Sequence, residues 1–346
     1  MKTTKLQVSP ETPENEKIST AVEFIKKGEL VAFPTETVYG LGANAFDPQA
    51  IRKIYLAKGR PSDNPLIVHV SSLDMAQELV IESVSSYEIA NRLWPGPVTL
   101  IFRKNKRIPD VVTGGMETVG IRFPAHPIAL ALISRSGVPI AAPSANLSGK
   151  PSPTEEKHVL EDMDGRIACI VLGGKTLFGL ESTIIDMTRN RPTLLRPGPV
   201  SPERLKDLLP ELVVPEFVMA KQGYKGPALS PGMKYRHYSP DVELILVEGT
   251  PEESSKKIEE LVKQSERKTV VLCTEETKEL YPKNFDRIVL GSRENLYIVA
   301  ANLFGALREL PAQGFQLLIS EAFPESGIGL AIMNRLRKAA WKILRV

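Results

Sequence analysis

Polar side chains follow several short apolar segments of this 346-residue chain. The clearest case follows residues 30–33, where the chain continues Pro-Thr-Glu-Thr-Val-Tyr-Gly-Leu-Gly and places two hydroxyls and a carboxylate beyond a predicted strand. In open α/β sheets, ligands bind in the crevice outside the carboxyl ends of the strands. Thr37 is therefore a candidate binding residue, whereas a lone Thr-x-Thr sequence would fit an ordinary turn.

Cationic side chains accompany the next two strands. Lys58 and Arg60 flank a glycine shortly before the apolar segment 66–70, which carries His69. They fit an anion site or a solvated loop. Arg122 stands in Val-Gly-Ile-Arg-Phe, which is apolar on both sides of the arginine. Because a buried arginine requires an anion or a carboxylate partner, Arg122 predicts either a ligand contact or a structural ion pair.

Hydroxyl and amide groups follow the apolar segment that ends at Ala142. Ser144, Asn146 and a nearby Ser-Gly pair have a composition that can form an anion-binding nest. Ser182 precedes another predicted strand, and Arg196 ends the one after it. Together, the hydroxyl clusters and four cations at strand ends predict a polar, phosphate-binding concavity without a Ser/His/Asp or Cys/His catalytic arrangement.

Three familiar motifs are excluded by their context. Gly40-Leu-Gly-Ala-Asn-Ala45 matches GxGxxA, but six polar or turn residues separate it from the strand ending at Phe33, so a dinucleotide site is disfavoured. Gly174-Lys-Thr resembles the end of a P-loop, yet Cys169 stands where its first glycine is needed. The four histidines and two cysteines show no metal-ligand spacing, so no metal site is expected.

The elements that must position these residues form two predicted domains. Residues 1–16 are polar and indicate a loose tail, and a helix pattern then runs from Ile18 to Gly28. The first domain is predicted over residues 17–219, as a twisted mixed α/β sheet with a basic concave cleft. Its predicted strands are 30–33, 66–70, 98–102, 119–123, 138–142, 170–172, 183–187 and 193–195.

A segment rich in proline and glycine, residues 220–241, predicts a linker. Beyond it, residues 242–346 alternate strand and helix patterns, which favours a small Rossmann-like, doubly wound parallel sheet. The predicted strands and helices are 243–247, 252–265, 269–273, 287–290, 294–310, 316–320 and a last helix from about residue 329.

Composition limits the classes of partner. Residues 241–346 hold 15 basic and 16 acidic side chains, which leaves 29 basic against 25 acidic, or +4, before them. No polybasic tail is present, so binding of nucleic acid by charge alone is disfavoured. The chain shows neither a signal-like start nor a run of about 20 apolar residues, and its scattered cysteines suit a reducing compartment. We expect a cytoplasmic protein without membrane contact.

The elements Pro34-Thr-Glu-Thr-Val-Tyr-Gly-Leu-Gly42, Lys58-x-Arg60 and Ser144-x-Asn146, in this order, resemble the YrdC-type threonylcarbamoyl-AMP synthases over residues 15–210. The linker sequence Ser230-Pro-Gly-Met-Lys-Tyr-Arg-His-Tyr-Ser-Pro240 resembles the two-domain version of that family. The resemblance implies formation of L-threonylcarbamoyl-AMP and pyrophosphate from L-threonine, bicarbonate and ATP with Mg2+. The product would serve threonylcarbamoyladenosine formation beside the tRNA anticodon, through downstream transfer proteins and with possible tRNA contact.

The resemblance also implies roles for individual residues. L-threonine would be bound by Thr37, His69, Arg122, Ala142 and Ser182. Catalytic roles fall to Lys58, Arg60, Ser144 and Asn146. ATP would be bound by Arg60, Asn64, Thr118, Ser144, Ser152, Arg196, His237 and Tyr238, the last two from a linker that acts as a lid. The pattern leaves the general base open. An RNA-binding module that uses the basic cleft is the alternative function.

Overall fold

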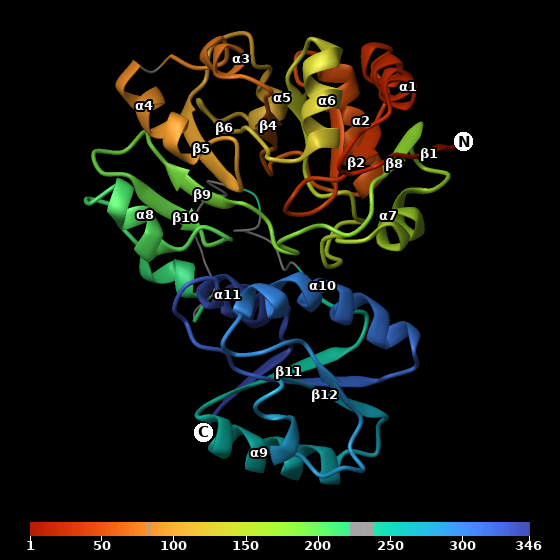
Figure 1. Cartoon of the computed structure of the whole chain (residues 1–346), viewed down its shortest axis with the longest axis vertical. Coiled ribbons are helices and arrows are strands. Elements are labelled where there is room, and N and C mark those ends of the chain that lie inside the picture. The colour runs from red at the N-terminus through yellow and green to blue at the C-terminus, as the bar shows by residue number, and fades with distance from the viewer. Residues whose placement is uncertain (82–83, 222–230, 232–237) are drawn as a thin grey trace.

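The computed structural model describes residues 1–81, 84–221, 231 and 238–346, which form two lobes stacked along the long axis in Figure 1. The upper lobe contains a ten-stranded sheet and the lower lobe a five-stranded one. The larger sheet mixes parallel and antiparallel pairs, whereas every strand pair of the smaller sheet is parallel. The predicted fold class, a mixed sheet followed by a parallel one, is confirmed.

The large sheet has the order β1-β8-β2-β3-β7-β4-β6-β5-β9-β10. Its strands are β1 (Thr4–Gln7), β2 (Val31–Phe33), β3 (Gly40–Asn44), β4 (Ile67–His69), β5 (Val98–Arg103), β6 (Thr118–Arg122), β7 (Ile140–Ala141), β8 (Cys169–Leu172), β9 (Thr183–Asp186) and β10 (Thr193–Arg196). Neighbours β4 and β6 are parallel and bring His69 opposite Arg122. The register thus places two predicted site residues side by side.

Helices cover both faces of this sheet. They are α1 (Asn15–Lys26), α2 (Pro48–Lys58), α3 (Leu73–Gln77), α4 (Val84–Leu93), α5 (Asp110–Thr113), α6 (Pro127–Ser136), α7 (Glu156–Met163), α8 (Pro202–Leu208) and the 3-10 helix η1 (Glu216–Met219). Helices α1 and α6 lie together in Figure 1 and bury one apolar face each against β2 and β8. The i, i+3, i+4, i+7 pattern from Ile18 to Ile25 is this buried face.

Two segments differ from the sequence expectation. The loose tail predicted for residues 1–16 is wrong for Thr4–Gln7, which forms β1 and pairs in parallel with β8. Its alternating exposure is that of a half-buried edge strand, which four residues show only weakly. The segment around Gly40 forms β3, an antiparallel partner of β2. Glycine is required at position 42 because a Cβ there would lie 2.7 Å from side-chain atoms of Phe33 and Ile140.

The second sheet has the order β13-β12-β14-β11-β15. Its domain contains β11 (Glu243–Glu248), α9 (Pro251–Gln264), β12 (Thr269–Cys273), η2 (Lys278–Leu280), β13 (Arg287–Val289), α10 (Leu296–Ala312), β14 (Leu317–Glu321), α11 (Gly329–Ala339) and β15 (Lys342–Arg345). In Figure 1, α9 lies on the far side of this sheet, and α10 and α11 lie between the sheet and the upper lobe. These two helices therefore form the surface that meets the first domain.

The contact between the domains is close. Gly179 has a positive φ of 67°, and a Cβ placed on it would lie 2.5 Å from the Cα of Ala301 in α10. Arg308 of α10 donates to the carbonyl of Pro151 at 2.8 Å and pairs with buried Asp162 at 2.9 Å. The helices of α10 and α11 thus pack on backbone and charged groups of the first domain.

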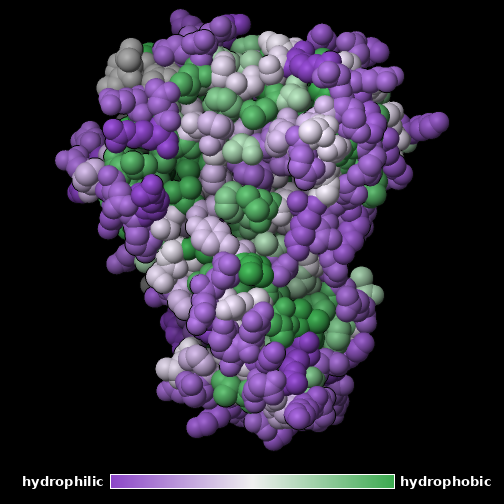
Figure 2. Space-filling view, viewed as in Figure 1, coloured by the Kyte–Doolittle hydropathy of each residue, from purple (hydrophilic) through white to green (hydrophobic). Residues whose placement is uncertain are grey.

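The outer surface is mostly hydrophilic on the face shown in Figure 2, with hydrophobic patches scattered over both lobes. Within the described residues, no helix combines the length and apolar character that crossing a bilayer would require.

Candidate functional site

A pocket lies at the ends of several strands of the large sheet. His69 ends β4, Arg122 ends β6 and Arg196 ends β10, and all three side chains line the pocket. The predicted crevice at the carboxyl ends of the strands is therefore present.

Most of the predicted site residues line this pocket. They are Thr37, Arg60, His69, Arg122, Ala142, Ser144, Asn146, Ser152, Ser182, Arg196 and Tyr238. Thr118 lines a smaller apolar pocket that shares Ile67 and Pro231 with the first. Lys58 and Asn64 are buried and line neither of these two pockets. His237 lies outside the described residues. Residues as far apart in the chain as Thr37 and Tyr238 are thus gathered around one space, and their individual roles stay predictions.

Arg122 holds the loop that follows β2. Its Nη1 donates to Thr37 Oγ1 at 2.8 Å, and its Nη2 pairs with Glu36 Oε1 at 2.6 Å. Thr37 also shares a hydrogen bond of 2.8 Å with the hydroxyl of Thr35. The alternative of a structural ion pair is therefore realised, and the same guanidinium also faces the pocket.

His69 is neutral in this environment. Burial and the positive charge of Arg122 lower the pKa of His69 to about 3. Its Nδ1 is buried and has no hydrogen-bond partner among the residues that the structure describes. A neutral imidazole with a free nitrogen can donate to or accept from a ligand hydroxyl, but it does not contribute charge.

Arg196 fixes the side of the pocket near β9. Its Nε donates to the carbonyl of Ser182 at 3.0 Å, and its Nη2 to the hydroxyl of Ser182 at 3.1 Å. That hydroxyl lies 2.7 Å from Thr99 Oγ1. Burial, together with the nearby charge of Arg335 and Arg122, lowers the pKa of Arg196 to about 10, despite the opposing effect of Glu181. The region is therefore rich in positive charge.

Lys58 lies behind the loop that carries the pocket residues Ser144 and Asn146 and bonds to its backbone. Its side chain is buried, and its ammonium donates to the carbonyls of Ser144 and Asn146, the latter at 2.6 Å. Burial and the charge of Arg60 lower the pKa of Lys58 well below its usual value. Of the two settings that the sequence allowed, a solvated loop is wrong for Lys58, which is buried. Helix α2 ends at Lys58, and Gly59 in the left-handed conformation turns the chain there. Lys58 holds the Ser144–Asn146 loop in place.

Glu181 is a pocket residue that the sequence reasoning missed. Its Oε1 accepts from Ser152 at 2.6 Å, and its Oε2 pairs with Arg335 of α11 at 3.0 Å. Although burial raises the pKa of Glu181, the charges of Arg335 and Arg196 and the Ser152 bond lower it to about 2. Its position next to Ser182 was the only available signal, and nothing local in the sequence points to Arg335.

Tyr238 belongs to the part of the predicted lid segment that the structure describes. Its ring stacks on Phe304 of α10 with a centroid distance of 5.2 Å, and it lines the pocket. The amide of Ser239 donates to the carbonyl of Gly149 at 3.1 Å, and Pro231 accepts from Arg196 Nη1 at 3.3 Å. Pro231 and Ser239 of the predicted lid segment therefore contact the first domain, and residues 222–230 and 232–237 lie outside the described part of the chain.

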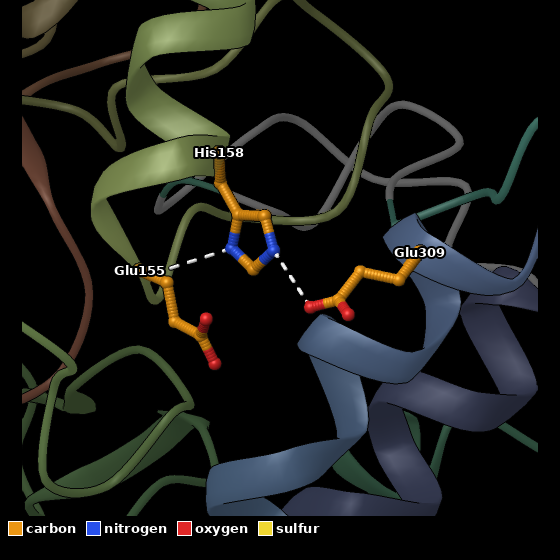
Figure 3. Close-up of side chains that lie close together, drawn as sticks. All are labelled: Glu155, His158 and Glu309. Carbon is orange, nitrogen blue, oxygen red and sulfur yellow. Dashed lines mark hydrogen bonds and ion pairs between the residues drawn. The ribbon is translucent and has the colours of Figure 1, made fainter. Parts of the chain in front are cut away.

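Glu155, His158 and Glu309 bring two carboxylates and an imidazole within 4.8 Å of one another (Figure 3). His158 Nδ1 accepts from the backbone amides of Thr154 and Glu155 at 3.3 Å each, which places the proton on Nε2. That nitrogen donates to Glu309 Oε1 at 3.3 Å, and the ammonium of Lys157 lies 2.7 Å from the same oxygen. The group's own hydrogen bonds and ion pairs occupy it, and it links α7 to α10.

Family models match nearly the whole chain. The model described as telomere recombination, which covers the Sua5, YciO and YrdC proteins, matches residues 23–198. The model of the threonylcarbamoyl-AMP synthase C-terminal domain matches residues 200–341. The threonylcarbamoyl-AMP synthase of Pyrococcus abyssi is 47% identical over 95% of this chain and 96% of its own length. The Bacillus subtilis protein of the same name is 48% identical over 93% of this chain and 92% of its own length.

A solved structure agrees with these matches. The crystal structure of Pyrococcus abyssi Sua5 complexed with L-threonine is 46% identical, covers 99% of this chain and 100% of its own, and superposes with a TM-score of 0.92. Escherichia coli YciO, at 24% identity and a TM-score of 0.52 over 57% of this chain, shares the fold of the first domain. From its strand-end pocket to its C-terminal sheet, this chain belongs to the two-domain threonylcarbamoyl-AMP synthase family.

Proposed function

We propose that this protein is an L-threonylcarbamoyladenylate synthase, a nucleotidyltransferase that forms L-threonylcarbamoyl-AMP and pyrophosphate from L-threonine, bicarbonate and ATP. The observation that carries the proposal is the convergence of Arg60, Arg122 and Arg196 in one pocket. Burial lowers the pKa of Arg60 and of Arg196 to about 10, and in each case another of the three adds to the effect. Guanidinium groups gathered in this way favour ligands that carry several negative charges, even though Arg122 is also paired with Glu36.

The reaction needs no protein nucleophile. The threonine amine, once deprotonated, combines with bicarbonate to give a carbamate and water. A carbamate oxygen then attacks the α-phosphate of ATP, the bond between the α-phosphate and the bridging oxygen breaks, and pyrophosphate leaves with the electron pair. Positioning of the two substrates and neutralisation of phosphate charge therefore supply most of the catalysis.

The residues divide the work by their chemistry. Arg122 and Thr37 suit the threonine carboxylate, and neutral His69 suits an uncharged polar group of the same substrate. Arg60, Arg196, Ser144 and Ser152 suit the phosphates. Lys58 acts on the phosphate site through the carbonyls that it holds.

Mg2+ would arrive with the triphosphate. Among the described residues that line the pocket, Glu181 is the one carboxylate, and both its oxygens already have partners in Ser152 and Arg335. A metal ion brought by ATP would therefore be held mainly by phosphate oxygens and water, which Mg2+ prefers. It would neutralise charge that develops on the leaving pyrophosphate.

The test is pyrophosphate release from ATP, measured with and without L-threonine and with and without added bicarbonate. We expect release that depends on both, and a product that carries the threonine carbon skeleton linked to AMP. Release that ignores threonine would reduce the protein to an ATPase and overturn the proposal.

An RNA-binding module is the competing function. It rests on the charge of +4 in residues 1–240 and would lose affinity steeply with added salt. The burial of Arg122 and Arg196 at one pocket favours a small anionic ligand instead. We further propose that the product passes to threonylcarbamoyl-transfer proteins that modify tRNA in the cytoplasm.

A further inference from the structure

Arg335 of the second domain is buried in the first. The side chain has no exposed surface, although it stands on α11, which covers the C-terminal sheet. Its Nε lies 3.0 Å from Glu181 Oε2, and its Nη1 donates to the carbonyl of Pro197 at 2.7 Å. One guanidinium therefore joins two separate segments of the other domain.

Both segments belong to the wall of the pocket. Glu181 lines it and accepts the hydrogen bond of Ser152, which also lines it. Pro197 directly follows Arg196, whose guanidinium lines the pocket on the same side. Arg335 thus supports two of the proposed nucleotide contacts, Ser152 and Arg196, without lining the pocket.

The third neighbour of Arg335 points the same way. Its Cζ lies 5.7 Å from the ring centroid of Tyr238, within the range of a cation–π contact, and Tyr238 lines the pocket. Docking of the domains has other polar contacts, among them Asn334 Nδ2 to the carbonyl of Val218 at 2.7 Å. Among the described residues, Glu181 and Tyr238 line the pocket, and Pro197 directly follows a residue that does.

We propose that Arg335 is a positioning residue through which the second domain sets the nucleotide affinity of the pocket in the first, an inference that rests on the proposed function. The guanidinium fixes Glu181 as an acceptor for Ser152 and fixes the chain beyond Arg196. A planar fork makes both contacts at once, which an ammonium does not. The threonine side, held by Arg122 and Glu36, has its own support.

The test compares Arg335→Gln with Arg337→Gln in the full chain. Arg337 stands on the same helix, is also buried, and forms ion pairs with Glu248 and Glu325 of the second domain. Its one contact to the first domain among the described residues is a hydrogen bond of 2.8 Å to the carbonyl of Met219, which does not line the pocket. We expect Arg335→Gln to weaken ATP binding about tenfold in titration calorimetry while threonine binding changes by less than about twofold. Arg337→Gln should leave both affinities unchanged.

Two further variants test the same contact if Arg335→Gln folds poorly. Arg335→Lys keeps a positive charge beside Glu181 but loses the fork, so it should recover only part of the ATP affinity. Adding Arg335→Gln to Glu181→Gln should weaken ATP binding no further, since the two act through one contact.

Wild-type ATP affinity in a folded Arg335→Gln or Arg335→Lys protein would reduce Arg335 to a docking contact and overturn the inference. Failure of the proposed function has a different signature, because the wild-type protein would then release no threonine-dependent pyrophosphate. Calorimetry of ATP binding reads the role of Arg335 without turnover.

Discussion

Arg122 Nη2 lies 2.6 Å from Glu36 Oε1, and neither side chain is more than 5% exposed. Breaking a buried pair by removing one partner leaves an uncompensated charge, which destabilises a protein strongly. Substitution of Arg122 therefore has two consequences, loss of a ligand contact and an unpaired carboxylate at Glu36. An experiment on Arg122 must separate them.

The first prediction concerns threonine affinity. Arg122→Ala combined with Glu36→Gln removes the stranded charge, and we expect it to weaken threonine binding roughly ten- to a hundredfold, the loss of a charge-assisted contact worth roughly 1.5 to 3 kcal/mol. ATP binding should change far less. Calorimetry with each ligand checks this, with Glu36→Gln alone as the control. Unchanged threonine affinity in the double variant would make Arg122 purely structural.

The second prediction concerns Lys58. Lys58→Ala leaves the carbonyls of Ser144 and Asn146 buried without their donor, so the unfolding free energy should fall by about 1 to 3 kcal/mol. Turnover should fall with it, because the loop at the phosphate site loses its support. Arg60→Ala, which removes a pocket-lining cation, is the control and should reduce turnover through ATP affinity. A Lys58→Ala protein of wild-type stability would contradict the wall role.

The third prediction follows from His69. The pKa of His69 is about 3 in the folded protein, against an ordinary value of 6.5 for histidine. Below pH 6.5 an unfolded chain binds a proton that the folded protein does not. The unfolding free energy should therefore fall as the pH drops from 6.5 towards 3, by up to about 1.4 kcal/mol per pH unit for this group.

The measurement is chemical denaturation of the wild type and of His69→Asn at several pH values across this window. The variant should show a shallower slope by one proton, whereas His126 and His158, whose pKa values are also lowered by burial, contribute equally to both proteins. If the unfolding free energies of the two proteins changed in parallel with pH, His69 would bind its proton as readily in the folded protein as in the unfolded chain, which would contradict the prediction.

The fourth prediction denies a thiol mechanism. Cys169 is fully buried in β8, and burial raises the pKa of its thiol to about 12. Cys169→Ser should lower the unfolding free energy by about 1 to 3 kcal/mol by burying a hydroxyl, with activity per folded molecule unchanged. Cys169→Ala serves as the apolar control. Loss of turnover after mild alkylation of the native protein would reverse this conclusion.

Apolar strands and the residues at their ends could be predicted from the sequence, because burial leaves a direct pattern. Thr269–Cys273 forms β12 with the predicted bounds, and Arg122, Ser182 and Arg196 meet in one pocket. Strand β3 was not predictable in the same way. Its glycines carry no apolar signal, and Gly42 is required by the approach of Phe33 and Ile140 from neighbouring strands.

Contacts between distant segments account for the rest. The turn at Gly59 decides that Lys58 points into the wall instead of the solvent, and a charged residue at a helix end gives no sign of this. Arg335 lies in a helix whose pattern indicates only burial against its own sheet. Its partner Glu181 is 154 positions away, and the docking of two domains brings them together.

The backbone of Gly179 lies so close to α10 that no side chain fits between the two domains at this position. A single methyl group there would press on the Cα of Ala301 and the carbonyl of Ala300, and helix backbone does not yield as the end of a side chain does. The nearest relief is a shift of the whole of α10, and with it the lobe that carries Arg335. One added carbon at Gly179 would therefore push the two domains apart, and the displacement would disturb the contact between Arg335 and Glu181, which lies two residues along the chain.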